Sequence, residues 1–192
     1  MRIDHVILAA ANLDSAAARL EAEHGLKVAG GGRHEGLGTH NRIVPLGGGY
    51  LELLAIADPE EAESSPLGHA LATRIAEAGE GIMGWAVAVD DVEPAARRLE
   101  TEVSTITREG LSARLTGVAE AMAEPFLPFF ISRDHGSEDP GSPGHAGGID
   151  WIELSGDAGR LDDWLGGAEL PIRMLDGPPA VRAVGIGGRM LL

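Results

Sequence analysis

The stretch "IDHVILAAANLDSAAARLE" at residues 3–21 decides the fold, because a similar sequence, "MGWAVAVDDVEPAARRLE", recurs at residues 83–100. Each stretch begins with a short apolar run that is typical of a strand and continues, after a turn, into a helical pattern. The second copy is one residue shorter at the turn. A repeated strand, turn and helix predicts a fold built from two copies of one module.

The remainder of each copy has the pattern of strands. After the first helix, apolar segments near 26–30, 40–46 and 50–57 complete a βαβββ unit. The segments "STITREG", "SARLTGVA" and "FLPFFISR" supply the corresponding strands of the second unit. A single unit would leave one sheet face and two edges uncovered, so we expect the two units to pair around a shared cleft. The predicted class is α+β, with repeated βαβββ modules forming a cupped mixed sheet and helices on the outside.

We expect one domain, residues 1–192, made of four parts. These are module one (1–58), a connecting helix (60–80), module two (82–133) and a third partial strand-helix-strand unit (148–192). Serine and proline at its start and glycine at its end mark the connecting helix. A loop rich in glycine, proline and serine separates module two from the third unit.

The composition limits the kinds of site and partner. The chain has no cysteine, which excludes disulfides and zinc-thiolate sites, so any metal ligands must be His, Asp or Glu. A net charge of -15 with scattered basic residues predicts no nucleic acid and no membrane partner. The N-terminal sequence lacks a signal-peptide pattern, which predicts a cytoplasmic location. A small-molecule ligand is the expected partner, and a homodimer is the other association that we consider.

A carboxylate lies inside an apolar strand of the stretch "GTHNRIVPLGGGYLELL", residues 38–54. This residue, Glu52, would lose much of its hydration energy in a buried strand unless a donor, a cation or water compensated it. Strand alternation places Glu52 on one face with Leu54, and His5 on one face with Ile7. If both faces point into the cup, the imidazole and the carboxylate meet there.

Three segments, "DHVILAAANLDSAAARL", "GRHEGLGTHN" and "GYLELLAI", resemble the glyoxalase-like branch of the vicinal oxygen chelate superfamily. The most specific features are the strand histidine, Gly38-Thr39-His40-Asn41 and Tyr50-Leu51-Glu52-Leu53. The resemblance implies a cupped sheet in which the first-strand His5 and the fourth-strand Glu52 can hold a divalent cation. Members of the superfamily include isomerases, dioxygenases, epimerases, thiol transferases and metal-free drug-binding proteins, so the fold alone does not select a reaction.

The metal ligand set is incomplete in this sequence. Imidazole and carboxylate suit Zn²⁺, Mn²⁺, Fe²⁺ or Ni²⁺, but the resemblance implies two more ligands from the second module. The positions equivalent to His5 are Trp85 and Trp151, and the strand equivalent to that of Glu52 carries a proline. Glu153, in "WIEL", is the replacement ligand that we consider. Three interpretations stay open: a metal site with help from Glu153 or a loop histidine, a metal-free acid-base pair of His5 and Glu52, or a hydrogen-bonded core remnant.

The predicted function is chemistry on a small organic molecule in the cup. His5 and Glu52 are the candidate catalytic residues, for metal-assisted lyase or isomerase chemistry. The candidate substrate-binding residues are Asn41, Tyr50, Trp85, Trp151 and Phe130. The alternative is a metal-free protein that sequesters an apolar ligand between Trp85, Trp151, Phe129 and Phe130 without turnover. We interpret His34, in a glycine-rich stretch, as solvated rather than as a lid residue.

Overall fold

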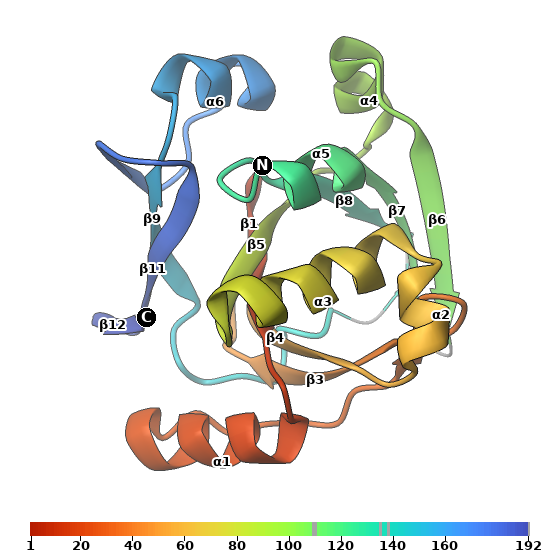
Figure 1. Ribbon diagram of the computed structural model, residues 1–192. Helices are drawn as coiled ribbons and strands as arrows, with labels where there is room; N and C mark the ends of the chain where they lie inside the picture. The colour runs from red at the N-terminus through yellow and green to blue at the C-terminus, as the bar shows by residue number, and fades with distance from the viewer. Residues whose placement is uncertain (109–110, 135, 138, 192) are drawn as a thin grey trace.

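The computed structural model describes residues 1–108, 111–134, 136–137 and 139–191. Within these residues the chain forms an eight-stranded sheet and a separate four-stranded sheet, which lie side by side in Figure 1. The larger sheet curls around two of the helices, and the smaller sheet stands against its outer side. The expected α+β class with a cupped mixed sheet is confirmed.

Each of the four expected parts contains helices, strands or both. Module one consists of β1 (Arg2–Ala9), α1 (Leu13–His24), β2 (Arg33–His34), β3 (Thr39–Pro45) and β4 (Tyr50–Ile56). Two helices follow, α2 (Pro59–Glu63) and α3 (Pro66–Ala78). Module two consists of β5 (Gly81–Ala88), α4 (Glu93–Leu99), β6 (Val103–Arg108), β7 (Leu111–Thr116), α5 (Val118–Ala123) and β8 (Phe129–Arg133). The third unit consists of β9 (Ile149–Ser155), α6 (Ala158–Leu165), β10 (Ile172–Leu175), β11 (Ala180–Ile186) and β12 (Arg189–Leu191).

Two element predictions differ from the structure. The strand expected near 26–30 is reduced to an isolated bridge between Ala29 and Ile43, and the second strand of module one is β2. The helix expected over 60–80 is two helices, because the Ser65 side chain accepts a hydrogen bond from the Gly68 amide and caps a new helix there. Pro66 at the first helical position suits this start.

The strand order of the larger sheet is β2-β3-β4-β1-β5-β8-β7-β6. Each module contributes four neighbouring strands, and its first strand runs parallel to its last, β1 beside β4 and β5 beside β8. The two modules meet where β1 and β5 pair antiparallel. The centre of the sheet is therefore the junction between the two copies.

The two faces of this sheet carry separate apolar clusters. The larger cluster, on the convex face, includes residues of α1 and α6 together with β9 and β11 of the smaller sheet. The cluster on the concave face includes Leu71 of α3 and Ala121 of α5. Helices α3 and α5 therefore lie inside the curve of the sheet (Figure 1), whereas we expected all helices outside.

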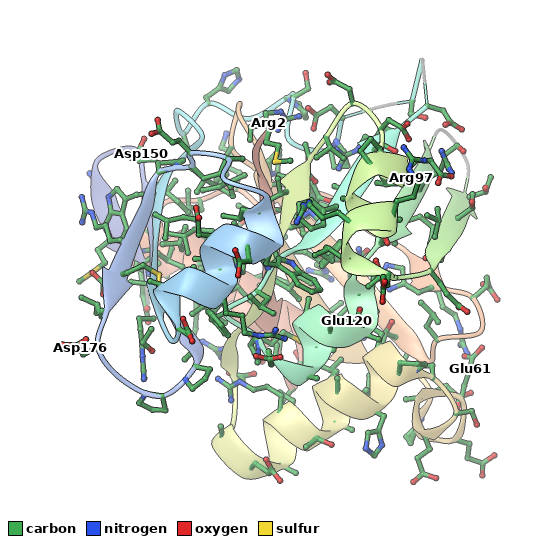
Figure 2. All side chains as sticks on the ribbon, turned by 90° about the horizontal axis from the view of Figure 1, so that it is seen from above. Arg2, Glu61, Arg97, Glu120, Asp150 and Asp176 are labelled. Atoms are coloured by element: carbon green, nitrogen blue, oxygen red, sulfur yellow. The ribbon has the colours of Figure 1, made fainter. Side chains whose placement is uncertain are left out.

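Charged side chains are spread over the surface of the molecule. In the view of Figure 2 the acidic residues Asp176 and Glu61 lie at opposite edges. This spread agrees with a net charge of -15 that is carried as a solvated surface. No helix among the described residues has the length and apolar character needed to cross a membrane.

The loop between β8 and β9 is fastened to the turn between β3 and β4. The Gly47 amide donates to the Gly141 carbonyl at 2.8 Å, and the Gly148 amide donates to the Leu46 carbonyl at 2.9 Å. The loop approaches so closely that a Cβ atom on Gly144 would lie 2.2 Å from the carbonyl carbon of Pro45. Glycine is therefore required where the loop crosses the turn.

Replacing Gly144 with alanine should destabilise the protein, because the added methyl group meets backbone that cannot move away. We expect Gly144→Ala to lower the free energy of unfolding by about 1–3 kcal/mol, measured by urea denaturation. Gly30→Ala is the matched control, since a Cβ there meets nothing within 4 Å, and it should change stability by less than about 1 kcal/mol. Equal stabilities of the two variants would contradict the close packing.

Candidate functional site

A cavity of about 360 Å³ opens on the concave face of the larger sheet. Module one lines it with polar residues, among them His5, Asn41 and Glu52. Module two lines it largely with apolar residues, among them Phe129 and Ile131. The cavity therefore has a polar wall from module one around Glu52, whereas its apolar lining comes mainly from module two, joined by Ile7 and Leu54 of module one.

Glu52 is the centre of the polar wall. Its side chain is 12% exposed, and the Asn41 Nδ2 donates to its Oε1 at 2.5 Å. The Nε2 atom of His5 lies 3.6 Å from Oε2, and the Nε2 atom of His34 lies 3.7 Å from Oε1. The carboxylate is thus held by an amide and flanked by two imidazoles. His5 and Glu52 do meet in the cup, and Asn41 joins them.

Behind His5 lies a buried ion pair. Asp4 is fully buried, and the Nη1 and Nη2 atoms of Arg133 each donate to one of its carboxylate oxygens at 2.7 Å. The Nδ1 atom of His5 lies 2.8 Å from Asp4 Oδ2. The pairing of β1 with β5 shifts register between Ile3 and His5, and at this irregularity the adjacent Asp4 and His5 side chains contact each other.

The ion pair fixes the charge of both its partners. Burial alone would raise the pKa of Asp4, but the hydrogen bonds and charges of Arg133 and His5 outweigh burial and hold this pKa well below its usual value. Burial alone would lower the pKa of Arg133, but Asp4 outweighs burial and raises this pKa. Asp4 is therefore a carboxylate at neutral pH, and a carboxylate only accepts hydrogen bonds.

This charge state assigns the proton of His5. Because Asp4 can only accept, the His5 Nδ1 carries a hydrogen and donates it, and in the neutral form of the ring Nε2 is then an acceptor directed at Glu52. The Nδ1 atom of His34 instead lies 2.9 Å from the hydroxyl oxygen of Thr39, which can donate or accept. The contact with Thr39 therefore permits the tautomer of His34 that carries its hydrogen on Nε2, and the two imidazoles can take opposite roles.

Two aromatic rings hold the His5 ring. The Tyr50 ring stacks on it with centroids 4.5 Å apart, and Phe129 meets it edge to face at 5.4 Å. Burial and the charges of Asp4 and Glu52 raise the pKa of Tyr50 well above its usual value, so Tyr50 remains a neutral phenol. The predicted Tyr50 therefore lines the cavity as a rigid, uncharged wall.

Trp85 and Phe130 do not line the cavity. Both are fully buried in the convex-face cluster, and the Trp85 Nε1 donates to the Phe126 carbonyl at 3.1 Å. Trp85 pairs with Val6 between the two register shifts of β1 and β5, and both side chains belong to the convex-face cluster. On β8, alternation turns Phe130 to the core and its neighbour Phe129 to the cavity.

Trp151 and Glu153 lie on β9, in the smaller sheet. The Trp151 indole lies across Gly185 of β11, where a Cβ atom would be 2.2 Å from Nε1, and the Arg173 guanidinium lies 3.9 Å from the ring centroid. Glu153 pairs in register with Arg173 and Ala183. Neither residue lines the cavity, so the expected third ligand is not brought to His5 and Glu52.

Sequence reasoning missed Asp4, Arg133 and the inward position of His34. Asp4 has the same signal as Glu52, because it is an acidic residue inside an apolar strand. The functional interpretation of this strand considered only its neighbour His5. Arg133 lies 129 positions away in the sequence, and no local pattern connects it with Asp4. His34 stands in a glycine-rich segment whose path over the cup cannot be read from periodicity.

The donors present do not fit a metal centre held by the protein. His5 and Glu52 supply two ligands, and even with His34 3.7 Å from the Glu52 carboxylate the described residues include no group of three His, Asp or Glu side chains suited to hold a metal ion. Catalytic metal sites in proteins commonly have three protein ligands with one open position. Module two faces His5 and Glu52 with Phe129 and Ile131, which cannot coordinate a metal.

Metal removal should therefore leave the protein unchanged. Dialysis against EDTA should not alter the thermal unfolding temperature, and adding Mn²⁺ or Ni²⁺ should shift that temperature equally in the wild type and in Glu52→Ala. A stabilisation by metal that both His5→Ala and Glu52→Ala abolish would show instead that these two residues are ligands.

Removing Arg133 should destabilise the protein strongly, because it leaves the Asp4 carboxylate buried and unpaired. We expect Arg133→Met to lower the free energy of unfolding by about 3–5 kcal/mol, measured by urea denaturation at pH 7. Arg114 pairs with Asp91 and Glu93 at the surface, so Arg114→Met should cost no more than about 1 kcal/mol. Similar costs for both variants would show that the buried pair contributes no more than a surface pair.

Comparison with solved structures supports the fold. A hypothetical protein from Staphylococcus aureus has a TM-score of 0.71 at 15% identity, and the match covers 98% of this chain and 96% of that chain. The Streptomyces coelicolor methylmalonyl-CoA epimerase, in complex with 2-nitronate-propionyl-CoA, has a TM-score of 0.56 at 22% identity, over 72% of this chain and 98% of that chain. The methylmalonyl-CoA epimerase from Mycobacterium tuberculosis has a TM-score of 0.51 at 18% identity, over 69% and 86%.

The sequence itself matches one family. No curated protein sequence matches the chain, but a family model described as a glyoxalase-like domain matches residues 3–166. This range contains both modules, His5 and Glu52, and it ends at the close of α6. The chain belongs to the glyoxalase-like domain family, and its fold is that of the vicinal oxygen chelate superfamily.

Proposed function

We propose that this protein catalyses proton transfer at a carbon atom next to a carbonyl group, in a small organic molecule bound in the cavity. The observation that carries the proposal is the Glu52 carboxylate, which lies between the Nε2 atoms of His5 and His34 at 3.6 and 3.7 Å. A carboxylate that is largely shielded from water is a suitable general base. The apolar wall opposite would hold the body of the substrate.

The three groups divide the chemistry between them. Glu52 removes the proton, so the C–H bond breaks and its electron pair moves into an enolate. The His34 Nε2, when it carries the proton, donates a hydrogen bond to the enolate oxygen. The His5 Nε2 accepts a proton from Glu52 and can return it. Delivery of a proton to the opposite face of the same carbon gives epimerisation, and delivery to a neighbouring atom gives isomerisation.

The comparisons support the reaction class only at the level of the fold. Two structural neighbours are named as methylmalonyl-CoA epimerases, at 22% and 18% identity. Epimerisation changes the configuration at a carbon atom, which agrees with proton removal and return. The donor set described above does not fit a metal centre, so the proposal assigns no step to a metal ion.

A second candidate is a protein that sequesters an apolar ligand without turnover. The apolar wall of module two, including Leu115, Phe129 and Ile131, supports this alternative. The aromatic residues expected to form it differ, since Phe129 lies in the cavity while Trp85, Phe130 and Trp151 do not. Binding without proton exchange would distinguish this function from catalysis.

Loss of the Glu52 carboxylate should abolish catalysis. In D₂O, the wild type should accelerate exchange of the protons next to the carbonyl in at least one of a panel of ketones, aldehydes and thioesters, followed by ¹H NMR. Glu52→Gln should reduce the enzymatic rate by about 100-fold or more, the contribution expected of a general base. Glu153→Gln is the matched control, an acidic strand residue outside the cavity, and should keep the wild-type rate.

Two results would contradict the proposal. The first is exchange that is equally fast in Glu52→Gln and in the wild type, because Glu52 would then not be the base. The second is saturable binding of a panel member without any acceleration of exchange, which favours the sequestering function.

A further inference from the structure

Among the described side chains that line the cavity, Glu52 is a shielded carboxylate without an arginine or lysine partner. The Arg133 guanidinium lines the cavity, but both of its Nη atoms are bound to Asp4. The pair is neutral as a whole, so Arg133 contributes no net positive charge to a ligand. Among the described side chains, Arg33 is the other cation that lines the cavity.

Arg33 is also paired. Its Nη2 donates to Glu61 at 2.6 Å and to Asp58 at 3.5 Å. Glu61 additionally accepts a hydrogen bond from the Gly36 amide at 2.7 Å. The guanidinium of Arg33 is therefore engaged with acidic groups outside the cavity, which reduce the attraction that it offers to an anion at the cavity mouth.

Within the part of the chain that the structure describes, no arginine or lysine pairs with Glu52, and its two imidazole neighbours are His5 and His34. Its closest donor is the Asn41 amide, which carries no charge, and the amide oxygen of Asn41 accepts from the Gly32 backbone at 2.9 Å. His5 and His34 become cations only by taking up a proton. A carboxylate or phosphate placed beside Glu52 would therefore meet a like charge in a poorly hydrated site.

We propose that the cavity selects ligands whose head group is uncharged, a ketone, aldehyde or hydroxyketone, joined to an apolar body. This inference rests on the proposed function for the choice of a carbonyl group. The head group would lie beside Glu52 and His34, and the body would lie against Ile7, Leu54, Leu115, Met122, Phe129 and Ile131, all of which line the cavity. A volume of about 360 Å³ is ample for a phenyl ring on a short chain.

The head group of such a ligand completes the hydrogen bonds of the polar wall. A carbonyl oxygen accepts from the His34 Nε2, and a hydroxyl group donates to Glu52 or to the His5 Nε2. A carboxylate accepts but donates nothing, so it leaves both of these acceptors without a donor. The preference for an uncharged head group thus rests on hydrogen-bond complementarity as well as on charge.

A matched pair of probes tests the inference. The ketone 4-phenylbutan-2-one and the acid 3-phenylpropanoate differ at the head group, where a methyl group replaces a carboxylate oxygen. Isothermal titration at pH 8 should show that the ketone binds the wild type at least about tenfold more tightly, or about 1.4 kcal/mol. Glu52→Gln removes the like charge, and should reduce this ratio to within about threefold by strengthening the binding of the acid.

Glu153→Gln is the control, since it removes one negative charge from the smaller sheet and should preserve the wild-type ratio. The inference is overturned if the acid binds the wild type as tightly as the ketone, if Glu52→Gln leaves the ratio unchanged, or if the ketone shows no saturable binding at millimolar concentration. The wild-type ratio tests it even where the variant unfolds.

The same probe separates this inference from the proposed function. If the ketone is preferred and its protons do not exchange, the charge selectivity holds and the catalytic proposal fails. If the acid is preferred while ketone protons exchange in a Glu52-dependent manner, the catalytic proposal holds and the selectivity fails.

Discussion

The buried ion pair between Asp4 and Arg133 is the interaction on which the rest of the site depends. Asp4 lies on β1 of module one and Arg133 on β8 of module two, the two strands on either side of β5, so the pair joins the two copies of the repeat at the centre of the sheet. A buried charge is tolerated only with its partner. The pair therefore requires the two modules to keep one relative position, and the same position sets the geometry of the site. The same carboxylate fixes the tautomer of His5.

The duplicated modules supply the same strands but chemically different walls. On β4 the cavity-facing residues are Tyr50, Glu52 and Leu54, whereas on β8 they are Phe129, Ile131 and Arg133. Strand alternation keeps these positions directed into the cup in both copies. Because Arg133 is occupied by Asp4, the second module contributes an apolar surface and a positioning charge, and the first module contributes the proton-transferring groups.

The parts of the fold that repeat within the chain were predictable from the sequence, including the meeting of His5 with Glu52, because strand periodicity specifies faces once a strand is recognised. Trp85 was misplaced because a register shift of one residue moves a side chain to the opposite face. Glu153 and Trp151 were misplaced because the third unit forms its own sheet. The residue pattern of a strand does not indicate which other strands pair with it. The contact between Asp4 and Arg133 joins residues distant in the sequence, which no local pattern could indicate.

Glu52 could be recognised as unusual in its apolar strand, and the structure supplies the compensation that its burial requires. The Asn41 amide satisfies one oxygen, and two imidazoles face the carboxylate without reaching full hydrogen-bond distance. Since Asp4 places a hydrogen on the Nδ1 of His5 while Thr39 permits His34 to carry its hydrogen on Nε2, the two rings are not equivalent. Because of this difference, the His34 ring can donate to a ligand oxygen while the His5 ring receives a proton. Two equivalent histidines would not divide these roles.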